Sequence, residues 1–142
     1  MCLYIDSCKT EREKFNKSLR KFYKVFVREE KTLLTPYFKW PIRAPGLLKA
    51  PPPDSVWLKY NEGMVGPGAF HARLLKESLK QDLFWVEQFE LGACIILEIP
   101  VQADSIVAYG NQDNVAFTEY EITEVMWDDA FKQKKATLKD LI

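Results

Sequence analysis

The sequence predicts an α+β fold in which residues 1–142 form a single domain with a mostly antiparallel sheet. Short runs of β-branched and aromatic residues, separated by turn residues, recur along the chain and predict strands. One longer segment, at about residues 74–90, repeats its apolar residues at the spacing of an amphipathic helix. The expected strands cluster between helices instead of alternating with them, which favours an antiparallel sheet. With 142 residues, 47% of them hydrophobic, the chain is long enough to build one core.

The first thirty residues predict a short N-terminal helix and a strand. Thr10 and Glu13 have the spacing of a capping box, and the apolar residues that follow recur at helical spacing. We therefore expect a surface helix over residues 10–20. Residues 21–28 are rich in aromatic and β-branched side chains, which is typical of a strand.

The next segment is dominated by proline. Pro36 and Pro41 disfavour helix in the residues before them, so residues 33–40 should be extended. Residues 41–53 contain five prolines, and we expect them to form a long surface loop, since proline cannot donate to the ladder of a central strand. Residues 55–60 predict another short strand.

The main helix and the strand after it are the clearest predictions in the second half. The helix should span about residues 74–90 and end before Gly92, a residue suited to helix termination. Residues 93–100 are apolar at nearly every position and predict the central buried strand, with Cys94 as an unreactive core thiol. The side of the helix that should face the core comprises Leu75, Leu79, Leu83 and Val86.

The last forty residues predict strands and a short C-terminal helix. Residues 105–109 form a short run of strand-forming residues, and residues 115–127 alternate strand formers with acids. Asp128 and Asp129 are expected to cap a final helix that continues through Leu141, because acids are favourable at a helix N-terminus.

The cysteines and the hydropathy pattern exclude several classes of protein. Cys2, Cys8 and Cys94 are an odd number without CxxC spacing, and one histidine cannot complete a zinc site with them. Asp6 interrupts the N-terminal apolar run, so this run does not predict a signal peptide. No apolar run approaches the roughly 18 residues of a membrane span. We expect a cytoplasmic protein, without metal or disulfides, that does not act at a membrane.

Charge is distributed unevenly although the net charge is zero. Residues 1–50 carry 12 Lys and Arg against 5 Asp and Glu, whereas residues 51–142 carry 8 against 15. If the two halves formed separate faces, the basic half could meet nucleic acid or an acidic partner. The alternative is that the halves interleave and neutralise each other within one fold.

The only histidine of the chain, His71, is the first candidate for a functional residue. Its unperturbed pKa places a charge change near neutral pH, and it follows a Gly-Pro-Gly sequence that predicts a loop leading into a strand. No second histidine exists, and the sequence has no GxSxG, Walker or GxGxxG motif. The residues therefore predict no catalytic set and no cofactor. His71 can be structural, with its imidazole bonded to backbone, or it can touch a ligand.

Aromatic residues beside basic residues form the second candidate. Such groups are typical of a groove that stacks a base or holds a nucleotide, although a small core also uses aromatics for volume. The candidate ligand-binding residues are Tyr37, Trp40, Trp57, His71 and Lys24.

Two carboxylates form the third candidate. Glu119 and Glu121 share one face of an expected strand, and paired carboxylates can perform acid–base chemistry if burial raises one pKa. The alternative is that they belong to the solvated face of a half-buried strand. They are the alternative catalytic residues.

Five short motifs, in this order along the chain, resemble small uncharacterised bacteriophage and prophage accessory proteins. The motifs are residues 1–5 (MCLYI), 23–25 (YKV), 35–37 (TPY), 68–72 (GAFHA) and 99–100 (IP). The resemblance implies an accessory protein in the cytoplasm of a host cell that acts in host interaction or anti-defence. It implies no mechanism, because no activity is established for these proteins.

The chain is also similar, more weakly, to minimal ADP-ribosyltransferase-like folds, in which polar residues grip NAD. That resemblance implies that Lys24 or Arg28 would bind NAD together with His71. Glu119 or Glu121 would then stand where the catalytic glutamate lies.

Three functional hypotheses follow from the sequence. The leading hypothesis is a binding protein without catalysis that occupies a host protein or sequesters a small nucleotide-like ligand. The alternatives are an enzyme that uses NAD or another nucleotide, and a structural protein of the virion, which would form a homo-oligomer.

Overall fold

The computed structural model describes residues 3–7, 19–36, 40–50, 64–65, 70–110 and 113–141. The strands of the first half are β1 (Leu3–Ser7), β2 (Leu19–Arg28), β3 (Leu33–Leu34), β4 (Pro41–Ile42), β5 (Gly46–Lys49), β6 (Met64–Val65) and β7 (Phe70–Arg73). The second half contributes β8 (Ala93–Gln102), β9 (Ile106–Gly110), β10 (Asn114–Phe117) and β11 (Glu119–Ile122). The α-helices are α3 (Lys80–Gln88) and α4 (Glu124–Lys132), and the 3₁₀ turns are η1 (Lys76–Leu79), η2 (Ala103–Ser105) and η4 (Leu138–Leu141).

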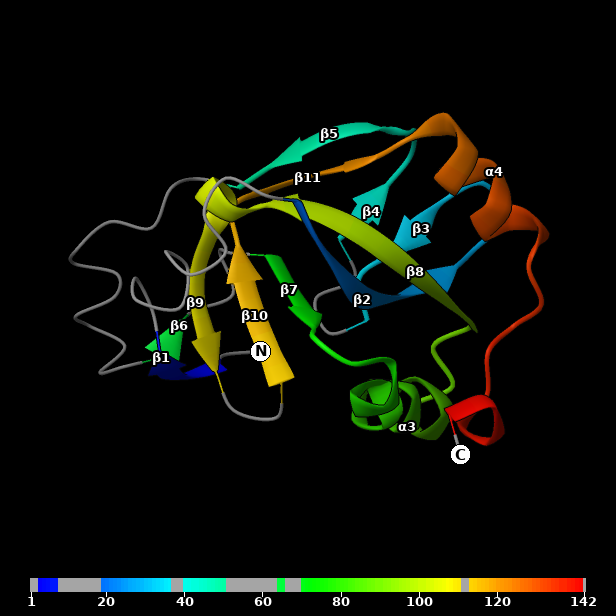
Figure 1. Ribbon diagram of the computed structural model, residues 1–142. Coiled ribbons are helices and arrows are strands. Elements are labelled where there is room, and N and C mark those ends of the chain that lie inside the picture. Colours follow the sequence, from blue (N-terminus) through cyan, green and yellow to red (C-terminus); the bar gives the residue numbers. More distant parts are fainter. Residues whose placement is uncertain are drawn as a thin grey trace.

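The described ladders are all antiparallel, which confirms the predicted α+β class. The larger sheet has the order β4-β3-β2-β7-β10-β9-β1-β6, and β8 pairs with β2 outside this path. β5 and β11 form a separate two-stranded sheet. The longest ladder joins β2 to β8 and runs from Leu19 opposite Gln102 to Arg28 opposite Ala93. This two-stranded ribbon crosses the middle of the molecule (Figure 1).

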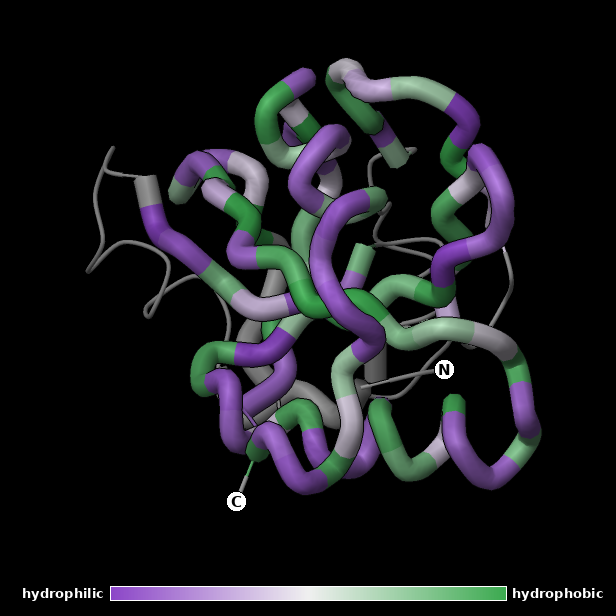
Figure 2. Tube along the Cα trace, turned by 90° about the vertical axis from the view of Figure 1, so that its right-hand side faces the viewer, coloured by the Kyte–Doolittle hydropathy of each residue, from purple (hydrophilic) through white to green (hydrophobic). Residues whose placement is uncertain are grey.

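Each face of the β2–β8 ribbon is covered by its own hydrophobic cluster. Residues directly opposite each other share a face, so Phe22 and Ile99 point to one side, and Val27 and Cys94 point to the other. The first side packs against β10, β11 and α4, and the second packs against α3 and η4. Figure 1 shows β11 and α4 on the side of the ribbon opposite α3 and η4. Within single elements the chain changes between hydrophobic and hydrophilic residues (Figure 2), as expected of elements with one buried side.

The charge halves interleave within the described residues. β2 belongs to the basic half and pairs along its length with β8 of the acidic half. Lys49 of β5 lies opposite Glu119 of β11, and the Nζ of Lys21 lies 3.9 Å from a carboxylate oxygen of Glu98. The described strands therefore do not separate into a basic and an acidic face.

The N-terminal boundary of β2 corrects the predicted helix over residues 10–20. Leu19 and Arg20 are strand residues opposite Gln102 and Val101, because the apolar β8 provides a partner for the whole length of β2. The rest of that predicted helix lies outside the described residues. The predicted strands over residues 21–28 and 105–109 are present with small changes of boundary.

The predicted surface loop over residues 41–53 is wrong in its first part. Residues 46–49 contain no proline, and they form β5, which pairs with β11. Pro41 lies in the two-residue strand β4 at the edge of the larger sheet, where a missing donor costs no ladder bond. The prolines at 51–53 and the predicted strand over residues 55–60 lie outside the described residues.

The main helix is shorter than predicted and consists of two parts. It begins as the 3₁₀ turn η1 and continues as α3 to Gln88. Leu75, expected on the buried side, lies before the helix and is exposed, whereas Leu79, Leu83 and Val86 are buried. Gly92 follows with a φ of +137°, a conformation that favours glycine.

The final helix also differs from its prediction. α4 begins at Glu124, before the expected caps, because the Thr123 hydroxyl accepts a hydrogen bond from the backbone N–H of Met126 and caps it. Asp128 and Asp129 therefore lie inside the helix. The helix ends at Lys132, and a separate turn, η4, follows. No helix among the described residues is long and apolar enough to cross a membrane.

Candidate functional site

The structure brings together only two of the described candidate ligand-binding residues, Lys24 and His71. Trp40 is exposed before β4, where its backbone N–H donates to the Thr35 side chain. Tyr37 and Trp57 lie outside the described residues. The described residues thus give no aromatic groove around His71.

Lys24 and His71 meet where β7 leaves the edge of β2. The two strands share a single pair, Tyr23 opposite Arg73, and then diverge. The Lys24 ammonium reaches across and donates to the backbone carbonyl oxygen of His71 at 2.6 Å. Its Nζ also lies 5.6 Å from the centre of the Phe26 ring.

Burial lowers the pKa of Lys24 from 10.5 to about 8, since desolvation disfavours the charged form. The carboxylate of Asp82 opposes part of this shift. The ammonium is nearly inaccessible and already donates to a carbonyl, so it serves to hold β7 against β2. The contact gives Lys24 a structural role.

A buried ion pair continues this polar group toward α3. The guanidinium of Arg73 donates from Nε and Nη2 to the two carboxylate oxygens of Asp82, both at 3.0 Å. Nearby, the Ser78 hydroxyl donates to Asp113 at 2.6 Å. Since a planar guanidinium and a carboxylate fit each other in this two-bond geometry, the pair fixes the orientation of α3 on the sheet.

The carboxylates of Glu119 and Glu121 lie on one face of β11, as predicted. Glu119 is half-buried and Glu121 is exposed, opposite Lys49 and Leu47 of β5. This placement is that of the solvated face of a strand. Among the described residues, no group of three His, Cys, Asp or Glu side chains is placed to hold a metal ion.

A different feature, the outer edge of β8, presents unused hydrogen-bonding groups. Within the described residues β8 pairs with β2 alone. The carbonyl oxygen of Cys94 accepts from the backbone N–H of Ala136, so the backbone groups of Cys94 point away from β2. Alternation along the strand then points the N–H and C=O groups of Ile96 and Glu98 outward as well. Neither residue has a backbone partner on that side in the described part of the chain.

Pro100 independently supports this assignment. It lies within β8, opposite Lys21, and has no N–H to donate. By the same alternation, the backbone nitrogen of Pro100 points to the outer edge, where no ladder bond is lost. Among the described residues β8 has a strand partner on one side only, so the predicted central position is wrong, whereas the predicted burial is confirmed. Residues 93–100 are apolar because both faces of β8 are covered.

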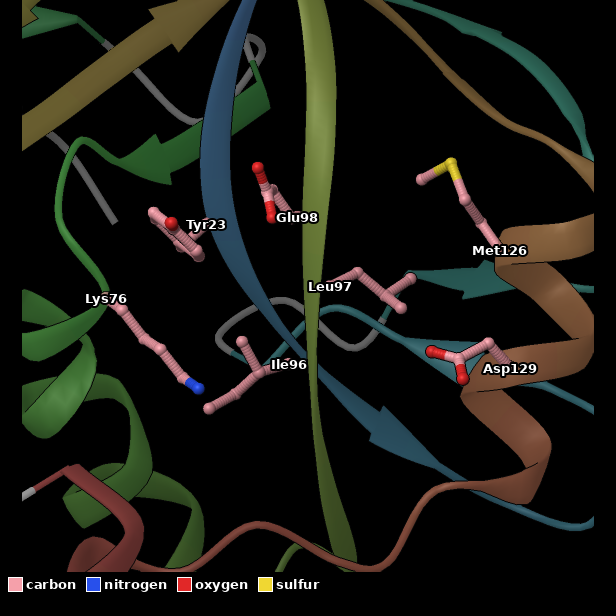
Figure 3. A pocket seen from close by; sticks show the side chains of 7 residues that line it. All are labelled: Tyr23, Lys76, Ile96, Leu97, Glu98, Met126 and Asp129. Carbon is pink, nitrogen blue, oxygen red and sulfur yellow. The ribbon is translucent and has the colours of Figure 1, made fainter.

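A cavity of about 310 Å³ lies along the open edge and is bordered by both faces of β8. Figure 3 shows Leu97 on the side of α4 and Ile96 on the side of Lys76 and Tyr23. The side chains of Ile96 and Leu97 therefore flank the outer edge of β8 in this opening, and charged groups lie on both rims. Its lining residues are Tyr23, Lys76, Ile96, Leu97, Glu98, Met126 and Asp129.

Sequence reasoning missed this site, although one signal was present. A proline inside an otherwise regular strand indicates an edge, and Pro100 is such a residue. Met126 and Asp129 could not be assigned to the site, because the predicted C-terminal helix began too late to place them on its first turns.

A second cavity, of about 450 Å³, lies between the end of α3 and the segment after α4. It is bordered by Cys94, whose pKa burial raises from 9.0 to about 12. A buried thiol with this pKa is a poor nucleophile. Cys94 is thus the core thiol that the sequence predicts, and the cavity gains no chemistry from it.

Comparison with known proteins gives no relative. No family model, curated protein or solved structure matches the chain. A functional proposal for this chain therefore rests on its own residues, and the open edge of β8 is its candidate functional site.

Proposed function

We propose that this chain is a phage- or prophage-type accessory binding protein without catalysis, which occupies a host protein by binding an extended segment of it at β8. The segment would add to β8 as a further strand. The observation that carries the proposal is the outward-pointing backbone of Ile96 and Glu98 beside a cavity. Backbone hydrogen bonds supply the affinity in this mode of binding, and pockets beside the strand supply the specificity.

The charges around the cavity favour a peptide over a nucleotide-like ligand. Two carboxylates, Glu98 and Asp129, and one ammonium, Lys76, line it. Phosphate groups would meet more negative than positive charge there. Lys24, the basic residue predicted to hold such a ligand, is buried elsewhere in the fold and donates to His71.

Hydrogen exchange measured by NMR tests the proposal residue by residue. In the free protein the amides of Ile95 and Leu97 should exchange slowly, because they bond to β2, and those of Ile96 and Glu98 should exchange fast. Peptides selected from a random heptapeptide library on the immobilised protein should slow exchange at Ile96 and Glu98. Selected peptides that bind without protecting these two amides would contradict the proposal.

A proline substitution provides the matched variant. Glu98→Pro removes an outward N–H at a position equivalent to Pro100, so the β2–β8 ladder should persist while peptide binding is lost. Glu98→Gln, which keeps the N–H, should retain binding. N-methylation of the peptide backbone should abolish binding to the unmodified protein, which excludes a folding defect as the cause. Should Glu98→Pro bind the peptides as well as Glu98→Gln does, the edge is not the binding site.

Self-pairing is the competing outcome. Two copies of β8 could pair edge to edge and form a homodimer, as a virion component would require. Size-exclusion chromatography with light scattering should show a monomer. A dimer that Glu98→Pro dissociates would replace the proposal with self-assembly.

A further inference from the structure

The register of an added strand determines which of its side chains meets α4. In an added antiparallel strand, the partner residues opposite Ile96 and Glu98 would exchange backbone hydrogen bonds with them, since these two residues point outward. The partner residue between them lies opposite Leu97 and shares its face. Figure 3 places that face toward Met126 and Asp129. One central side chain of the bound segment therefore extends toward α4.

The surface that would contact this side chain is apolar next to β8 and acidic farther along α4. Leu97 is buried and Met126 is half-buried, and both line the cavity. Asp129 lies one helical turn beyond Met126 and is exposed. Its Oδ2 accepts from the Gln133 side chain at 3.1 Å, and Oδ1 has no partner among the described residues. A long apolar stem with a cationic head fits this surface.

The opposite face of β8 differs in the charge that it presents to a bound segment. Ile96, Glu98, Tyr23 and Lys76 border it, so the Lys76 ammonium faces a partner side chain placed there. The Glu98 carboxylate lies 3.9 Å from the Nζ of Lys21 and so already has a cation beside it. Asp129 is thus the carboxylate that remains to bind a cation brought by the partner.

We infer that the segment bound at β8 carries an arginine or lysine opposite Leu97, and that Asp129 determines this preference. The inference rests on the proposed function and adds the chemistry of the partner to it. Asp129 is a specificity-determining residue in this scheme, and the backbone of Ile96 and Glu98 provides the shared affinity.

The test uses three labelled peptides that differ at one position. Fluorescein-labelled Ser-Val-Xaa-Val-Ser, with arginine, norleucine or glutamate at Xaa, is titrated to millimolar concentration by anisotropy, and protection of the Ile96 and Glu98 amides is followed by NMR. The arginine peptide should bind about fivefold more tightly than the norleucine peptide, the size expected of an exposed ion pair, and the glutamate peptide should bind most weakly. This preference should shrink as salt rises.

Two variants assign the preference to Asp129. Asp129→Asn should bring the arginine and norleucine peptides to within twofold of each other, and Asp129→Lys should favour the glutamate peptide. Asp128→Asn is the matched control, because Asp128 is an exposed neighbour on α4 that does not line the cavity. It should leave the preference unchanged.

The outcomes separate the inference from the proposed function. If all three peptides bind equally and protect the Ile96 and Glu98 amides, the inference fails and the proposed function stands. An arginine preference that survives in Asp129→Asn also overturns the inference. If no peptide binds or protects these amides at millimolar concentration, both fail.

Discussion

The ammonium of Lys24 and the backbone carbonyl oxygen of His71 lie 2.6 Å apart in the buried gap between β2 and β7. A lysine side chain here takes the place of the backbone donor that a continuous ladder would supply, since β7 has already diverged from β2. β2 and β7 can therefore diverge at this point while the carbonyl oxygen of His71 still accepts a hydrogen bond. Burial of the same ammonium makes the free energy of unfolding depend on pH.

Lys24 should make the protein more stable as pH rises from 8 to 9. The pKa of Lys24 is about 8 in the folded protein and 10.5 when the chain unfolds, so between these values the unfolded chain binds more protons. The free energy of unfolding then increases with pH, by about 1 kcal/mol over this unit. The Cys94 thiol acts in the opposite direction from about pH 8 upward, because burial raises its pKa from 9.0 to about 12 in the folded protein.

Urea denaturation at several pH values checks this prediction. Lys24→Met should lose the increase between pH 8 and 9 because it has no titrating amine. Equal pH dependence in the two proteins would show that Lys24 is not the group responsible.

The ion pair between Arg73 and Asp82 should be sensitive to loss of one partner. Asp82→Asn removes the carboxylate that pairs with the buried guanidinium of Arg73, which should lower the free energy of unfolding by about 3–5 kcal/mol. Lys21→Met, which breaks the exposed pair with Glu98, should cost under about 1 kcal/mol. Urea denaturation measures both. Similar losses in the two variants would mean that the buried pair is less constrained than its geometry indicates.

Gly92 should resist substitution for two reasons. Its φ is +137°, and a Cβ added there would lie 2.8 Å from Cγ1 of Val27. Gly46 has a similar φ of +148° with open space around it, so Gly46→Ala measures the backbone strain alone. Thermal unfolding should show Gly92→Ala less stable than Gly46→Ala by about 1–3 kcal/mol, the cost of overpacking. Equal losses would assign the whole effect to φ.

The N-terminus of α4 should depend on the Thr123 hydroxyl. Thr123→Ala removes the acceptor for the Met126 N–H and should destabilise the protein by about 1 kcal/mol in urea denaturation. Thr123→Ser keeps the hydroxyl and should stay close to the original protein. If serine is as damaging as alanine, the methyl group of Thr123 matters and the cap does not.

Local patterns predicted much of the fold. The runs of strand formers in β2 and β8 and the apolar spacing of α3 are properties of neighbouring residues, and the structure has these elements near their expected positions. The sequence does not predict β5, because the prolines on both sides of it indicate a loop. The start of α4 was misplaced because Asp128 and Asp129 offered a more conspicuous cap than Thr123.

The site residues were harder to predict from the sequence than the fold. Their arrangement depends on which strands pair and on contacts between residues far apart in the sequence. Lys24 and His71 are 47 residues apart, and their contact follows from where one strand leaves another. The open edge of β8 is likewise defined by what does not pair with it. Only Pro100 carried local information about that edge.

Pro100 also limits what the open edge can do. A long apolar strand with a free edge invites other chains to stack on it, and fibril-forming segments need about six or seven residues of uninterrupted pairing. At one end of β8 the carbonyl oxygen of Cys94 already accepts a hydrogen bond from the backbone N–H of Ala136. At the other end Pro100 has no N–H and so interrupts the series of outward-pointing backbone donors. The stretch that remains, Ile96–Glu98, is long enough to bind a short peptide segment and too short to nucleate an amyloid fibril.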